Sequence, residues 1–100
     1  MKYTIFYLEK CPFSMKALEI LEEEKVDYTI FKFSDELDDS NGKLVKSPLN
    51  GKEYYFGKGK YDKKMFKDFF GKDSTFPRIY KGEDFLGGYT DLEKEFNYAP

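Results

Sequence analysis

A chain of 100 residues with 40% hydrophobic residues is typical of one soluble globular domain with a buried core. Its net charge of −2 disfavours nucleic-acid binding through bulk basicity, and no apolar run approaches the ~20 residues of a membrane-spanning helix. With no His at all, the commonest general base, the protease arrangements that use it and most zinc sites are excluded. The single Cys allows no internal disulfide and no signal-peptide pattern is present, so we expect a cytoplasmic protein.

The first third of the chain predicts a β-α-β unit. Residues 2–8 are β-branched or aromatic on both faces, which is typical of a central strand. From Pro12 the apolar period changes to that of a helix ending near Glu24, and residues 26–33 are strand-like again. The short connection after the helix predicts that the two strands are parallel.

Residues 34–60 have the weakest pattern. Residues 43–47 and 52–56 can pair as an edge hairpin across the turn 48–51, which contains Asn50-Gly51. Pro48 keeps either arm from being a central strand.

The last third predicts a helix, a β-hairpin and a final helix. Asp62 can cap a helix that runs to Phe70 and stops at Gly71. A strand ending at Tyr80 turns through 81–83 and returns through 84–86 as its antiparallel partner. We expect a capping box, formed by Thr90 and Glu93, to start the last helix. This order predicts a small mixed α/β sandwich with helices on both faces of the sheet.

Cys11 lies between the first strand and the first helix, and Pro12 suits the first helical position. The unpaired N–H groups at a helix N-terminus favour a thiolate over a thiol, and Lys10 adds a cation beside it. A lone Cys is most often an inert buried side chain. The strand–Cys-Pro-x-Ser–helix context instead favours a reactive one.

Three separated motifs together resemble a glutaredoxin on the thioredoxin fold. They are Cys11-Pro12-Phe13-Ser14, Thr75-Phe76-Pro77 and Gly87-Gly88-Tyr89-Thr90-Asp91-Leu92. The resemblance covers 2–33 and 61–97. It implies a single domain over 1–100 with a thioredoxin-like sandwich, a four-stranded mixed sheet flanked by helices, and an insert at about 34–60 between the second strand and the helix before the third.

The resemblance also implies roles for residues near the first two motifs. Cys11 would be the nucleophile that exchanges with a glutathione mixed disulfide, and Phe13 would line the groove. Pro77 matches the family's cis-proline, and Phe76 would present its backbone N–H and C=O to the ligand. Ser14 stands where dithiol members have a second cysteine, which implies a monothiol route. It would donate a hydrogen bond to the Cys11 thiolate, be a helix-compatible filler, or be an engineered replacement of a resolving cysteine.

The last motif would bind the γ-glutamyl end of glutathione. Gly88 would allow close backbone approach, and the N–H groups of Thr90 and Asp91 suit the carboxylate. The Asp91 side chain would pair with the ammonium, and Lys10 is a candidate for the glycyl carboxylate. Plain helix capping by Thr90 and Asp91 is compatible with these roles.

These residues support an oxidoreductase that uses glutathione as co-substrate and acts on glutathionylated proteins or small disulfides, as a monomer. No nucleic-acid or membrane partner is expected. An alternative is an iron–sulfur cluster carrier in which two chains each supply Cys11 and glutathione supplies the other thiolates; no other metal ligand is expected. A redox-inert binding module is a third possibility.

Overall fold

The computed structural model describes residues 2–36, 42–57 and 59–96, so part of the expected insert lies outside the described residues. Contacts divide the chain into two compact units, Met1–Phe31 with Thr75–Pro100 and Lys32–Ser74. We call them the first and second unit. No helix within these described ranges is long and apolar enough to cross a membrane.

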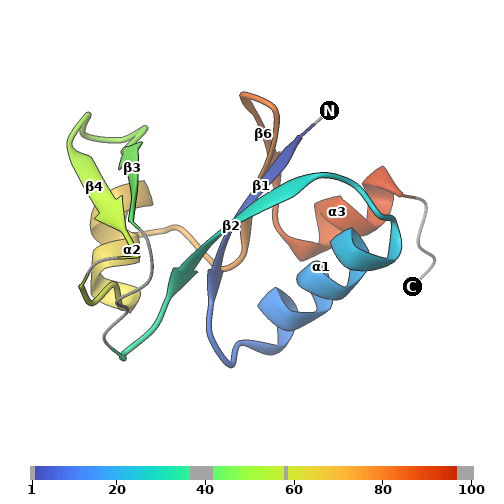
Figure 1. The fold of residues 1–100 in the computed structure, drawn as a ribbon, viewed down its shortest axis with the longest axis horizontal. Helices are drawn as coiled ribbons and strands as arrows, with labels where there is room; N and C mark the ends of the chain where they lie inside the picture. Colours follow the sequence, from blue (N-terminus) through green and yellow to red (C-terminus); the bar gives the residue numbers. More distant parts are fainter. Residues whose placement is uncertain (1, 37–41, 58, 97–100) are drawn as a thin grey trace. The chain divides into compact units, whose positions relative to one another are not determined.

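The sheet of the first unit has the strand order β2-β1-β5-β6. Its strands are β1 (Tyr3–Leu8), β2 (Tyr28–Phe33, which ends in the second unit), β5 (Arg78–Lys81) and β6 (Asp84–Gly87). β5 is antiparallel to both β1 and β6, while β1 and β2 run in the same direction (Figure 1). The expected mixed four-stranded sheet is therefore confirmed.

Helices α1 (Pro12–Glu23) and α3 (Tyr89–Glu95) lie side by side along this sheet (Figure 1). Alternate residues of β1 point into the core between sheet and helices because successive side chains of a strand alternate between faces. The buried residues of this core are Tyr3, Ile5, Tyr7, Ala17, Ile20, Leu21, Ile79 and Leu92. Burial of each large side chain contributes about 1.5–3 kcal/mol, so this core holds the two helices against the sheet.

The second unit contains β3 (Lys43–Lys46), β4 (Glu53–Phe56) and α2 (Lys63–Phe70). The predicted hairpin is confirmed, with Lys43 opposite Phe56, and it forms its own two-stranded sheet rather than an edge of the larger one. The predicted start and end of α2 are also confirmed: the Asp62 side chain accepts a hydrogen bond from the Met65 N–H at 3.1 Å, and Gly71 has a φ of 111°. Aromatic rings fill the core of the second unit, namely those of Phe33, Phe56, Phe66, Phe69 and Phe70.

The start of α3 differs from the expectation. Gly88 is the N-cap residue, and its N–H donates to Asp91 Oδ2 at 3.1 Å. Glu93 instead accepts a hydrogen bond from the Tyr89 hydroxyl at 3.0 Å. The predicted capping box of Thr90 and Glu93 was therefore wrong, because the N-cap is Gly88 and the helix begins two residues earlier than that box requires.

Candidate active site

Cys11 is the N-cap residue of α1. Its backbone is extended, with φ −82° and ψ 122°, and Pro12 follows at the start of the helix as predicted. The Cys11 N–H donates to the Leu8 carbonyl at 3.2 Å, and its carbonyl accepts the Met15 N–H at 3.0 Å. These bonds hold the backbone at the end of β1 and leave the thiol half-buried rather than enclosed.

Ser14 lies fully buried in the first turn of α1. Its hydroxyl oxygen accepts a hydrogen bond from the Leu8 N–H at 3.2 Å. Within the described residues, no hydrogen bond joins this hydroxyl to Cys11. The geometry thus gives Ser14 a role beyond those three alternatives, as the group that ties the end of β1 to α1, and its catalytic role stays a prediction.

The Thr75-Phe76-Pro77 segment leads directly into β5. The Phe76–Pro77 peptide bond is cis, in agreement with the sequence interpretation. Pro77 is buried, Phe76 is half-buried and Thr75 is exposed. A Cβ built on Gly88 would lie 3.5 Å from the Pro77 carbonyl oxygen, so the start of α3 lies against this segment.

The glycine requirement belongs to Gly87 rather than to Gly88. Gly87 has a φ of 133°, and a Cβ there would lie 2.1 Å from Asp91 Oδ2. Gly88 has an extended φ of −102°, and the Cβ contact at 3.5 Å is an ordinary one. Gly87 therefore makes room for the carboxylate that holds the Gly88 N–H.

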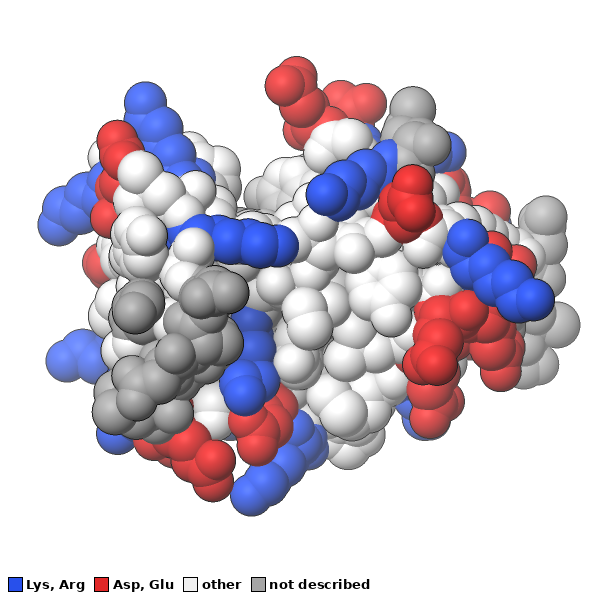
Figure 2. Space-filling view, viewed as in Figure 1, with Lys and Arg blue, Asp and Glu red and all other residues white. Residues whose placement is uncertain are grey.

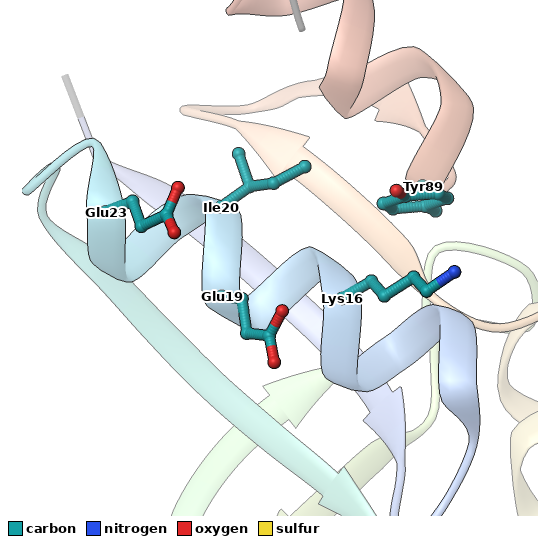
Figure 3. Close-up of a pocket in the computed structure, with 5 residues that line it drawn as sticks. All are labelled: Lys16, Glu19, Ile20, Glu23 and Tyr89. Carbon is teal, nitrogen blue, oxygen red and sulfur yellow. The ribbon is translucent and has the colours of Figure 1, made fainter. Parts of the chain in front are cut away.

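Two aromatic rings connect the first turn of α1 to the first residue of α3. The Phe13 ring is 56% exposed, and its centroid lies 5.8 Å from that of Tyr89. Tyr89 also lines a cavity of about 250 Å³ between α1 and α3, together with Lys16, Glu19, Ile20 and Glu23 (Figure 3). Burial, followed by the Glu93 and Glu19 carboxylates, raises the pKa of the Tyr89 hydroxyl.

Comparison with solved structures identifies the fold. Glutaredoxin 1 from Francisella tularensis, crystallised in complex with cacodylate, aligns over 96% of this chain and 92% of its own, with a TM-score of 0.63 and 16% identity. A glutaredoxin from E. coli aligns over 99% of this chain and 100% of its own, with a TM-score of 0.45 and 20% identity. The chain has the glutaredoxin fold. Comparisons with protein-family profiles and with curated proteins give no match.

On this glutaredoxin fold, the sequence-predicted site residues all belong to the first unit. The Phe13–Tyr89 contact and the Gly88–Pro77 approach bring segments around the three motifs together. Lys10 is exposed, with a left-handed φ of 69°, and no contact connects its side chain to the other motifs within the described residues. No group of His, Cys, Asp or Glu in the described part of the chain is arranged to hold a metal ion.

Sequence reasoning assigned no role to Gly87, Lys16 or Tyr89. The Gly87-Gly88 pair before the last helix was a usable sequence signal for Gly87, because Gly readily adopts a positive φ. The places of Lys16 and Tyr89 depend on how α1 packs against α3, which no local pattern specifies.

Proposed function

We propose that this protein is a glutathione-dependent thiol–disulfide oxidoreductase that removes glutathione from mixed disulfides through Cys11 alone. The observation that carries the proposal is a half-buried Cys at the N-cap of α1 on a glutaredoxin fold. The N–H groups of Phe13 and Ser14 lie in the first turn, where they have no carbonyl partner within the helix. They are donors available to a thiolate, the form that attacks a disulfide.

The reaction requires two exchanges at one sulfur. The Cys11 thiolate attacks the glutathione sulfur of the mixed disulfide, so that a Cys11–glutathione disulfide forms and the substrate thiolate leaves and takes up a proton. A second glutathione thiolate then attacks that disulfide, which releases oxidised glutathione and restores the Cys11 thiolate. One substrate disulfide is reduced and two glutathione units are joined, so electrons balance without a second protein thiol.

Residues of the three motifs would hold glutathione beside Cys11. We assign the backbone of Phe76, next to Pro77, to the cysteinyl part, and Phe13 to one wall of the groove. The N–H groups of Thr90 and Asp91, at the start of α3, suit the γ-glutamyl carboxylate. Gly88 keeps this end of the groove open, and Lys10 is assigned to the glycyl carboxylate.

The test is steady-state reduction of a small glutathione mixed disulfide by glutathione, with the native chain and Cys11→Ser compared against the rate without protein. We expect turnover in the native chain and the background rate in the variant. Mass spectrometry of the native chain under oxidised glutathione should show one glutathione added at Cys11.

A native chain no faster than free glutathione would overturn the proposal. Colour and iron in protein purified without oxygen would then support the cluster-carrier alternative instead.

A further inference from the structure

The cavity between α1 and α3 is not used by the chemistry described above. Its lining residues come from successive turns of α1, with Tyr89 from the start of α3 (Figure 3). Lys16 and Tyr89 lie at one end of this row, Glu23 lies at the other, and Ile20 lies between them. Glu19 lies in the middle of the row together with Ile20, so one carboxylate is near the cationic end and the other is at the far end (Figure 3).

One aromatic contact links the cavity lining to the first turn of α1, near Cys11. Tyr89 lines the cavity and also contacts Phe13, with 5.8 Å between the ring centroids. Phe13 is two residues from Cys11 and is largely exposed. The shortest route from a glutathionylated cysteine held at Cys11 to the cavity would cross Phe13 and Tyr89.

The charge around the cavity is mainly negative. Glu19 and Glu23 line it, and Glu93 accepts a hydrogen bond from the Tyr89 hydroxyl at 3.0 Å. Among the described residues of the lining, Lys16 is the one cation. Lys16 Nζ lies 6.0 Å from the Tyr89 ring centroid, so its charge is held at the Tyr89 end. Figure 2 shows acidic side chains gathered over the C-terminal half of α1, where Glu19, Glu22 and Glu23 are exposed. After burial, the Glu93 and Glu19 carboxylates also contribute to the raised pKa of the Tyr89 hydroxyl.

We propose that this cavity is a subsite for a lysine or arginine side chain of the glutathionylated polypeptide, with Glu19 and Glu23 as its counter-charges and Ile20 against the aliphatic stem. This inference rests on the proposed function and names its substrate class. Lys and Arg suit such a place because they bury an apolar stem while the charged head stays near water and carboxylates.

Helix geometry sets where in the substrate this basic residue should be. Glu19 and Glu23 lie 8 and 12 residues beyond Cys11 on α1, which at 1.5 Å per residue is roughly 12–18 Å along the axis. An extended peptide covers about 3.3–3.6 Å per residue. The basic side chain should therefore be about four or five residues from the glutathionylated cysteine.

The experiment uses pairs of synthetic S-glutathionylated peptides that differ only by Lys or norleucine at one position. In the distant pairs, the variable position lies four or five residues before or after the cysteine. In the control pair, it lies next to the cysteine. Reduction by glutathione is followed with the native chain, Glu19→Gln with Glu23→Gln, Lys16→Gln, and Glu22→Gln. Glu22 is a matched control because it is exposed on the same helix but does not line the cavity.

We expect the native chain to favour the distant Lys peptide over its norleucine partner by about 2- to 5-fold in kcat/KM at low salt, as for exposed ion pairs. The Glu19/Glu23 variant should bring this ratio close to one, Lys16→Gln should raise it, and Glu22→Gln should leave it unchanged. Only the distant position should respond.

An equal kcat/KM for both distant peptides in the native chain overturns the subsite, while turnover of the small mixed disulfide shows that the Cys11 reaction still stands. An equal loss of preference in Glu22→Gln also overturns it, because the effect would then be one of general charge. If neither the peptides nor the small disulfide are reduced, the proposed function fails and the subsite fails with it.

Discussion

The Ser14 hydroxyl has a structural task at the residue scale. It is buried inside the first turn of α1 and accepts the Leu8 N–H at the end of β1. An acceptor at this point keeps a partly buried backbone donor satisfied, and it fixes the approach of the strand to Cys11.

Ser14→Ala tests this task. The variant leaves the Leu8 N–H without its acceptor, so we expect a loss of about 1–3 kcal/mol in the free energy of unfolding. Reduction of a small glutathione mixed disulfide, per folded molecule, should stay within a factor of two. Urea unfolding and steady-state kinetics measure the two quantities. Unchanged stability with a tenfold loss of turnover would assign Ser14 to catalysis instead.

Gly87 governs the position of the Asp91 carboxylate. In Gly87→Ala the new Cβ would lie 2.1 Å from Asp91 Oδ2, so the carboxylate must leave the Gly88 N–H. We expect a loss of about 1–3 kcal/mol in stability and a higher KM for glutathione. Urea unfolding and glutathione titration of the rate check these effects.

Gly59→Ala is the matched control for strain. Gly59 has a φ of 106°, and a Cβ there would meet nothing within 4 Å. The Gly59→Ala variant should lose stability through backbone strain alone and should keep the native KM for glutathione. An equal rise in KM in both variants would show that Gly87 does not act through Asp91.

At the scale of elements, the C-terminal end of α3 is tied to two strands. Glu95 accepts a hydrogen bond from the Tyr3 hydroxyl of β1 at 2.8 Å and pairs with Lys81 of β5 at 2.5 Å. The Lys81 ammonium and then the Tyr3 hydroxyl lower the pKa of the Glu95 carboxyl. Burial, with the Glu95 contact, raises the pKa of Tyr3.

The lowered pKa has a defined sign for stability. Because the Glu95 pKa is lower in the folded chain, the unfolded chain takes up the proton first as the pH falls. The stabilisation by the Glu95 carboxylate is therefore complete above the ordinary Glu pKa and is lost as the pH falls through the folded pKa. Glu95→Gln should therefore flatten the acid side of a melting-temperature profile between about pH 7 and pH 3. Glu83→Gln, in the exposed turn between β5 and β6, should keep the native slope. Identical slopes in all three proteins would contradict the assignment.

How far the sequence predicts these features depends on whether their causes are local. The hairpin of β3 and β4, the cap at Asp62 and the stop at Gly71 follow from turn and capping residues at their own positions. The start of α3 was mispredicted because Thr90 and Glu93 form a stronger local pattern than a Gly at the N-cap. The partners of Ser14 and Tyr89 come from packing, which only the folded chain specifies.

At the scale of the whole molecule, each unit has a buried core of its own. Leu92 is fully buried in the first core, where it holds α3 against the sheet. Leu92→Ala should lower the free energy of unfolding by about 2–5 kcal/mol, a large part of the 5–15 kcal/mol typical of a small protein. Leu92→Met, which preserves volume, should cost less than about 1.5 kcal/mol. A Leu92→Ala midpoint in urea equal to that of the native chain would show that this core does not hold α3.

Cys11 carries the only thiol of the chain. Three residues further on, where a second cysteine could pair with it, the chain has the buried Ser14. An isolated molecule therefore cannot close an internal disulfide, and any disulfide that it forms shares a sulfur bond with another molecule. For exchange with glutathione, mass action makes the modified fraction follow the ratio of reduced to oxidised glutathione, with both concentrations at first power. A protein that closes its own disulfide would follow the square of reduced glutathione instead. Diluting the glutathione pool at constant ratio would thus leave this chain's oxidation state unchanged, whereas that of a dithiol protein would shift.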